Sequence, residues 1–295
     1  KPLEAGRIAR WIALGALASI LLLATTNQIT QWSAVIPFLW IAPLALYLLS
    51  FVLAFGRQHG GDIRWYALAF LILAAIVLVA GRPDTPTRFV TDFALHIVTL
   101  FAGCMVCHVE VVRLQPGPRQ LPAFYLALSI GGAIGGLLVA LGAPLIFSDY
   151  REFPLVLVAI ALLSAAILWR DRAAHSFAWL RPASALGAVA FVAGLSLMLW
   201  REIGQASDIV DRARNFYGVV SIVRDKMDDP EEASLVMRQA GVDQGSQYFK
   251  AERRLEPACA FNEDSGLGKA LRFNARRRAD PNAPLRIGVL GLGAG

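Results

Sequence analysis

The sequence predicts a polytopic α-helical membrane domain of about seven helices, followed by a small antiparallel β-region and the first strand of a truncated Rossmann-like α/β domain. Of its 295 residues, 56% are apolar and only 17% are charged. The mean hydropathy of +0.53 exceeds that of soluble domains. Charged residues gather after Trp200, so the chain divides into domains over 1–203, 204–262 and 263–295.

Each predicted membrane helix is an apolar run that is long enough, or nearly so, to cross about 30 Å of hydrocarbon. Trp and Tyr residues stand near the ends of these runs, as in the aromatic belts of membrane proteins. The two shorter runs that begin at Trp65 and Phe153 are the weakest spans. The chain is therefore expected to have the lipid bilayer as a partner. The predicted helices cover Arg10–Thr26, Ser33–Phe55, Trp65–Ala80, Phe89–Cys107, Pro122–Phe147, Phe153–Trp169 and Ala183–Trp200.

Excess positive charge lies in alternate loops between these runs. The loops around 57–64, 110–119 and 170–181 are basic, whereas the intervening loops are neutral or slightly acidic. The positive-inside rule places the basic loops in the cytoplasm. It also explains the basic composition without nucleic-acid binding, which we do not expect. If all seven helices span, the same rule places the chain after Trp200 outside.

Short alternating stretches follow Asp208 and predict a small antiparallel sheet. Strands are expected at Phe216–Val223, at Ser234–Arg238 and near Gln247–Phe249, with Asp228–Glu232 as a turn.

A helix is expected next, capped by Asp264 or Ser265, with a basic last turn at Arg276–Arg278 that suits the negative end of the helix dipole. After a linker at Pro281–Pro284, the segment LRIGVLGLGAG predicts a buried strand that runs into a glycine turn.

The glycine turn is a candidate ligand site. Gly291, Gly293 and Gly295 let a backbone approach a ligand closely, with the N-terminus of a following helix available to polar groups. The GxGxG spacing is shorter than the GxGxxG of dinucleotide folds and is used by proteins that bind S-adenosyl ligands. A plain strand–turn is the alternative.

Two motifs in the membrane part have a structural and a functional interpretation. CMVCH, Cys104–His108, matches the CxxCH pattern of covalent haem attachment, but cysteine is also a common small apolar residue in helices. We favour the apolar role and predict no metal site. In GGAIGG, Gly131–Gly136, two overlapping GxxxG patterns favour close helix packing over a transport hinge.

Ionisable residues also occur along the same apolar run. His96 either belongs to a relay or substrate path, or is a neutral side chain bonded to a neighbouring helix. Glu110 and Arg113, just past the end of the run, are expected to mark the membrane interface.

Four stretches of the chain match one family in the same order. They are CHVEVVRLQPGPRQLPAFYLALSIGGAIGGLLVALGAPLIFSDYREFPLVLV, ARNFYGVVSIVRD, GSQYFKAERRLEPACAFNEDSGLGKAL and RIGVLGLGAG. The first resembles the membrane part of bacterial fused major-facilitator-like/spermidine synthase-like proteins, and the others resemble the start of their synthase-like domain. By this resemblance the chain is an internal piece of a longer protein, truncated at both ends.

The resemblance implies a transferase that takes decarboxylated S-adenosylmethionine or S-adenosylmethionine as donor, and a polyamine or other amine as acceptor. Gln247 would approach the donor, and Gly291, Gly293 and Gly295 would form its glycine loop. The acidic ribose ligand and the catalytic residue are expected beyond Gly295, so this piece alone is expected to be inactive. The resemblance implies a multi-pass protein of the bacterial inner membrane with a cytoplasmic soluble domain. This conflicts with the charge rule unless one run does not cross, the rule fails here, or the domain has a different role; we expect the cytoplasmic placement.

The segment EPACAFNED departs from the family, because synthases carry Tyr, Glu and His there and this chain has no Tyr or His. Diamine recognition is therefore open. The alternative function is a polyamine or small-cation transporter-like protein with a non-catalytic synthase-like domain, which acids inside the membrane would favour. A structural membrane scaffold is a third possibility.

Overall fold

The computed structural model describes residues 4–30, 39–56, 62–80, 86–170, 180–205, 208–215, 218–239, 242–257, 262–275, 279–280, 284 and 286–288. The chain divides into two compact units, Lys1–Ile203 and Gly204–Gly295.

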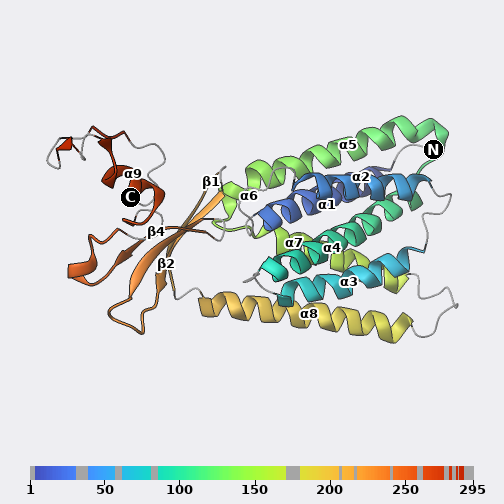
Figure 1. Cartoon of the computed structure of the whole chain (residues 1–295). Helices are drawn as coiled ribbons and strands as arrows, with labels where there is room; N and C mark the ends of the chain where they lie inside the picture. The colour runs from blue at the N-terminus through green and yellow to red at the C-terminus, as the bar shows by residue number, and fades with distance from the viewer. Residues whose placement is uncertain are drawn as a thin grey trace. The chain divides into compact units, whose positions relative to one another are not determined.

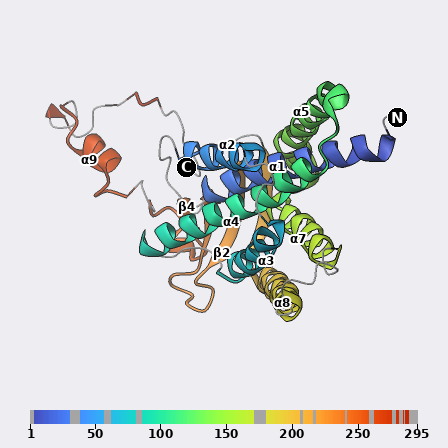
Figure 2. The same ribbon diagram turned by 90° about the vertical axis from the view of Figure 1, so that its right-hand side faces the viewer.

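The first unit is a bundle of apolar helices (Figures 1 and 2). Among the described residues, five helical stretches are long and apolar enough to cross a membrane: Ala5–Thr30, Ile63–Ala80, Arg88–Arg113, Pro118–Ile146 and Glu152–Arg170. This supports the prediction of a membrane protein. The elements are α1 (Ala5–Thr30), α2 (Ile41–Gly56), α3 (Ile63–Ala80), α4 (Pro86–Arg113), η1 (Pro118–Gln120), α5 (Leu121–Leu137), η2 (Leu138–Gly142), α6 (Ala143–Ile146), α7 (Glu152–Arg170) and α8 (Leu180–Gln205).

The expectation about the weakest spans was wrong. Helices α3 and α7 both meet the length and hydropathy of a span, whereas α2 and the apolar part of α8, Ala185–Arg201, are shorter. The apolar runs are shorter than helices α3 and α7 themselves, because each helix continues through charged terminal residues such as Arg64 and Arg170. Both arginines are paired with carboxylates there, Arg64 with Asp62 and Arg170 with Glu110.

Helix α4 is the central helix of the bundle. Of its span, 72% is buried against other helices, compared with 28% for Pro118–Ile146. At its midpoint, a Cβ on Gly103 would lie 2.6 Å from Leu21 of α1 and 2.8 Å from Phe70 of α3. Only glycine allows three helices to approach so closely here.

Glycines also bring α5 against α1. A Cβ on Gly131 would collide with the carbonyl oxygen of Ile12, and one on Gly135 would lie 2.6 Å from the carbonyl oxygen of Ala16. The packing interpretation of GGAIGG is therefore confirmed.

The predicted run Pro122–Phe147 is not one regular α-helix, because α5 passes through the π-helical turn η2 before α6. Pro144 explains the irregularity. It has no N–H to bond the carbonyl four residues earlier, and its ring would clash with that carbonyl. A single π turn relieves this conflict.

Contacts between helices fix their directions. Helices α1 and α4 run antiparallel, since Trp11 Nε1 donates to the Leu114 carbonyl over 3.1 Å while Leu21 meets Gly103. Helices α3 and α8 run in the same direction, since Gly187 lies against Leu71 and Arg201 donates to the Val79 carbonyl.

The second unit contains a four-stranded antiparallel sheet in the order β1-β2-β3-β4. Its strands are β1 (Ile209–Asn215), β2 (Gly218–Asp225), β3 (Ser234–Gln239) and β4 (Val242–Tyr248). The antiparallel sheet, the turn and strands β2 and β3 were predicted. The strand predicted near Gln247–Phe249 overlaps only the end of β4, which begins five residues earlier. Strand β1 was not predicted, because the sequence IVDRARN lacks the alternation of apolar and polar residues.

The helix after the sheet is shorter than predicted. Helix α9 covers Gly266–Arg272 and is capped by Ser265, whose hydroxyl accepts from the Gly268 N–H over 3.0 Å. Asp264 is therefore not the cap, and Arg276–Arg278 lie outside the described residues.

The predicted buried strand is not formed where the chain is described. Residues 286–288 have no regular secondary structure, and Ile287 is 56% exposed. A buried strand of an α/β sheet needs neighbours to accept its backbone hydrogen bonds. No such neighbour pairs with these residues among those described.

Candidate functional site

Gln247 lies on β4, one of the two edge strands of the sheet, opposite Leu235 of β3. Its side chain is exposed, whereas Gly245 two residues earlier is buried. A primary amide offers both donors and an acceptor, so an exposed Gln on a sheet edge is available to a polar ligand.

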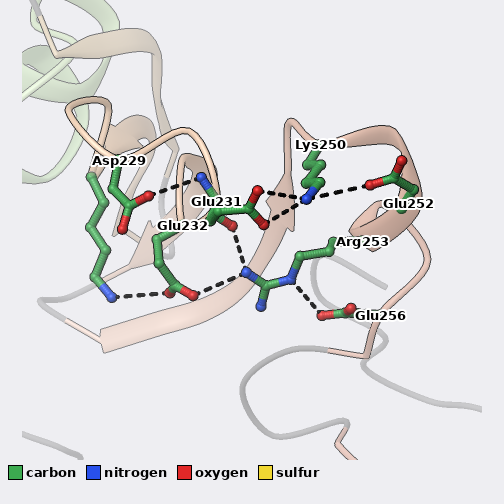
Figure 3. A network of polar contacts seen from close by, with 8 residues as sticks. Asp229, Glu231, Glu232, Lys250, Glu252, Arg253 and Glu256 are labelled. Atoms are coloured by element: carbon green, nitrogen blue, oxygen red, sulfur yellow. Dashed lines mark hydrogen bonds and ion pairs between the residues drawn. The ribbon is translucent and has the colours of Figure 1, made fainter.

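An ion-pair network links residues shortly after Gln247 in the chain to residues of the turn between β2 and β3 (Figure 3). Lys250 Nζ lies 2.6 Å from Glu231 Oε1, and Arg253 Nη1 lies 3.0 Å from Glu232 Oε1. The Arg253 guanidinium also stacks 3.9 Å from the centre of the Tyr248 ring. These contacts join the β2–β3 turn to the segment after β4.

The network perturbs its ionisable groups. The hydrogen bond from Arg253, followed by that from Lys226, lowers the pKa of Glu232. The hydrogen bond to Glu231 raises the pKa of Lys250, and the one to Glu256 raises that of Arg253. Glu232, Lys250 and Arg253 therefore all stay charged at neutral pH, and their ion pairs hold the turn between β2 and β3 in place.

The predicted glycine loop, Gly291, Gly293 and Gly295, lies outside the described residues, as does the stretch 258–261. Of the predicted cofactor-binding residues, the structure therefore describes Gln247 alone.

In the first unit, CMVCH lies inside α4, where both thiols are fully buried. His108 lies 5.2 Å from the Tyr47 ring and 5.3 Å from the Phe51 ring, and its Nδ1 is 3.0 Å from Ser50 Oγ. Attachment of haem requires thiols that a vinyl group can reach, so this burial favours the apolar role of the two cysteines.

His96 is also buried, with its ring stacked on Phe153 of α7 at 5.4 Å. Its Nδ1 lies 2.7 Å from the carbonyl oxygen of Asp92, one turn earlier on the same helix. Because a carbonyl only accepts, Nδ1 carries the proton. Of the two interpretations given for His96, these contacts fit a neutral side chain, with Nδ1 bonded within α4 and the ring packed on α7.

Glu110 does more than mark the membrane interface, as had been predicted for it. Its carboxylate is buried and receives two hydrogen bonds from Arg170 of α7, while Arg113 lies 3.9 Å away. The sequence hid this pair, because the two partners are far apart in the chain and lie at the ends of separate apolar runs.

Buried acids were a second feature that the sequence analysis missed. Asp92 and Glu152 are each only 6% exposed, although both lie near the ends of predicted spans. Within the described ranges, no three His, Cys, Asp or Glu side chains are grouped as metal ligands. Comparison of the chain with protein-family models, curated proteins and solved structures finds no match.

Proposed function

We propose that the protein is a membrane-anchored, spermidine synthase-like transferase in which the second unit binds an S-adenosyl ligand. One observation carries the proposal. An exposed glutamine, Gln247, stands on an edge strand of a small antiparallel sheet that precedes the GxGxG segment in chain order. The GxGxG segment that ends at Gly295 supplies the supporting sequence evidence.

The proposed chemistry is transfer of an aminopropyl group to an amine. The amine lone pair attacks the carbon beside the donor's sulfonium, a C–N bond forms, and the electrons of the broken C–S bond pass to sulfur. The nitrogen then loses a proton. Gln247 is proposed to hold the donor through its amide, and no catalytic role is assigned to it.

The proposal places the protein in the bacterial inner membrane with the second unit in the cytoplasm, where S-adenosyl compounds are made. The acceptor is proposed to be a polyamine or another amine.

Calorimetric titration of the whole natural protein, purified in detergent, tests the proposal, with decarboxylated and ordinary S-adenosylmethionine as probes. We expect heat of binding from at least one donor and a weaker affinity after Gln247→Ala. Gln239→Ala is the matched control, because it makes the same change on β3 at the far end of the sheet from Gln247. Absence of binding heat from both donors would rule the proposal out.

A second candidate function is transport of a polyamine or small cation by the helical unit. The observation that favours it is the burial of Asp92 and Glu152 in the bundle, because acids inside a membrane domain commonly serve cations. Uptake of radiolabelled putrescine into proteoliposomes separates the two candidates, since a transferase anchor gives none.

A further inference from the structure

We propose that the helical unit holds a binding site for a small monovalent cation at Asp92, at the end of the bundle where α4 and α7 begin. The site belongs to the first unit alone, so it stands whether or not the second unit binds an S-adenosyl ligand.

Asp92 has a buried carboxylate oxygen, Oδ2, without a hydrogen-bond partner among the described residues. The whole residue is 6% exposed. Removing an ionised carboxylate from water is costly where one of its oxygens gains no hydrogen bond in return. A bound cation removes that penalty.

A second buried acid, Glu152, lies at the same level of the bundle. Helices α4 and α7 run in the same direction, because His96 stacks on Phe153 at one end and Glu110 pairs with Arg170 at the other. Asp92, one turn before His96, therefore lies level with the start of α7. Buried Glu152 adds a second acid there.

The helix dipole stabilises the carboxylate of Glu152 more than that of Asp92. Glu152 is the first residue of α7, where the positive end of the helix stabilises a carboxylate. Asp92 lies beyond the first turn of α4, where this effect has fallen away. Within the part of the chain that the structure describes, the carboxylate that still lacks a partner, at Oδ2, is thus that of Asp92.

Deeper in the bundle, oxygen atoms continue the polar stripe. Thr99 lies on the same face of α4 as Asp92 and His96, and its hydroxyl donates to the Leu95 carbonyl, which leaves the oxygen as an acceptor. One turn beyond the Leu21–Gly103 contact, antiparallel α1 brings Thr25 opposite Thr99. The Thr25 hydroxyl is buried and has no hydrogen-bond partner among the described residues.

Charge and spacing define the ligand. One uncompensated carboxylate matches one positive charge, and the described residues offer no cluster of three metal-binding side chains for a divalent ion. Asp92 and Thr99 are about 10 Å apart along the helix axis. A single ion therefore binds at Asp92, with the threonine pair as an inner polar position. Alkali ions and the ammonium group of a small amine share this chemistry.

Thermal unfolding in detergent tests the site at constant ionic strength, with N-methylglucamine chloride replaced stepwise by sodium, potassium or butylammonium chloride. We expect a saturable rise in Tm, because a ligand that binds only the folded state stabilises it. Asp92→Asn should abolish the rise. Asp149→Asn is the matched control at the same end of α7, because asparagine can still accept the Tyr150 N–H bond that Asp149 accepts.

Each outcome has a defined meaning. A rise with sodium or potassium identifies an alkali-ion site, and a rise with butylammonium alone identifies an amine site. No rise with any cation, or an equal rise in the wild type and both variants, overturns the proposal. Far-UV circular dichroism of Asp92→Asn must match the wild type, and the isosteric change makes this the expected result.

Discussion

Arg170 of α7 forms a bidentate ion pair with the carboxylate of Glu110 on α4, with Nη1 2.9 Å from Oε1 and Nη2 3.3 Å from Oε2. The Glu110 side chain is 6% exposed, whereas that of Arg170 is 55% exposed. Two-pronged pairs of this kind are stronger and more directional than single hydrogen bonds. The pair therefore fixes the height of α7 against the central helix.

Arg170→Ala should destabilise the bundle by about 1–2 kcal/mol, less than the roughly 3–5 kcal/mol for breaking a fully buried pair, because solvent screens the exposed arginine. SDS-induced unfolding measures the loss. Arg119→Ala is the control, since Arg119 is an exposed arginine shortly after the end of α4. An equal loss in the control would mean that net charge, and not the Glu110 pair, sets the effect.

The glycine contact between α1 and α5 gives a second prediction. Gly131→Ala and Gly135→Ala should each cost about 1–3 kcal/mol, because the added methyl group meets backbone oxygen that cannot move aside. Gly136→Ala should cost little, since the nearest atom to a Cβ there is Leu23 Cδ1 at 3.9 Å. Melting temperatures of the three variants in one detergent give the comparison. Equal losses at all three positions would show that helix flexibility, and not the contact, controls stability.

Much of the helical unit could be predicted, because an apolar run of fixed length is imposed by the bilayer itself. The GxxxG contact was also predictable, since close helix packing needs small residues at this spacing. The partner of Glu110 was not, because periodicity within one run says nothing about which other helix meets it. The burial of Asp92 was missed for the same reason.

The second unit was harder to predict. Strands β2 and β3 alternate well enough to be recognised, but β1 carries Asp211, Arg212 and Arg214 in a short edge strand. Edge strands often carry charge on positions that solvent reaches. Residues 286–288 were predicted as a strand but do not form one. An apolar run forms a strand only where neighbouring strands complete its hydrogen bonds.

The structure shows that Ser265, and not Asp264, caps helix α9, a choice that the sequence left open. Ser265→Ala should destabilise this short helix by about 1 kcal/mol, because the Gly268 N–H loses its acceptor. Asp264→Ala should leave the helix intact. Amide hydrogen exchange of the peptide that covers 266–272 reports the difference, and faster exchange in the Asp264 variant alone would reverse the assignment.

The ion-pair network of the second unit predicts acid sensitivity. The Glu232 pKa is lowered in the folded protein, chiefly by Arg253. Its stabilising contribution is therefore fully present above the pKa of the unfolded chain, and it is lost as pH falls through the lower folded-state value. Hydrogen exchange in the 226–233 turn, corrected for intrinsic rates, should increase below about pH 4.

Arg253→Ala should raise exchange in this turn at neutral pH and remove much of its acid dependence. Arg254→Ala, a change to the exposed neighbour, should keep the wild-type profile. A wild-type acid response in the Arg253 variant would place the responsible carboxylate elsewhere.

The directions of the helices predict that the ends of α4 and α8 lie on opposite sides of the membrane, and this can be tested. Arg113 acts electrostatically on Asp62, so the start of α3 and the end of α4 share one end of the bundle. Helix α8 runs in the same direction as α3 and therefore ends at the opposite end. Reporters inserted after Gln205 and after Gln115 should lie on opposite sides of the membrane.

A transferase that uses a cytoplasmic donor requires the Gln205 reporter to be inside. The basic residues at the Arg113 end instead favour that end as the cytoplasmic one. Phosphatase activity from the Gln205 reporter, which requires export, would exclude a cytoplasmic S-adenosyl donor and leave the cation site at Asp92 untouched.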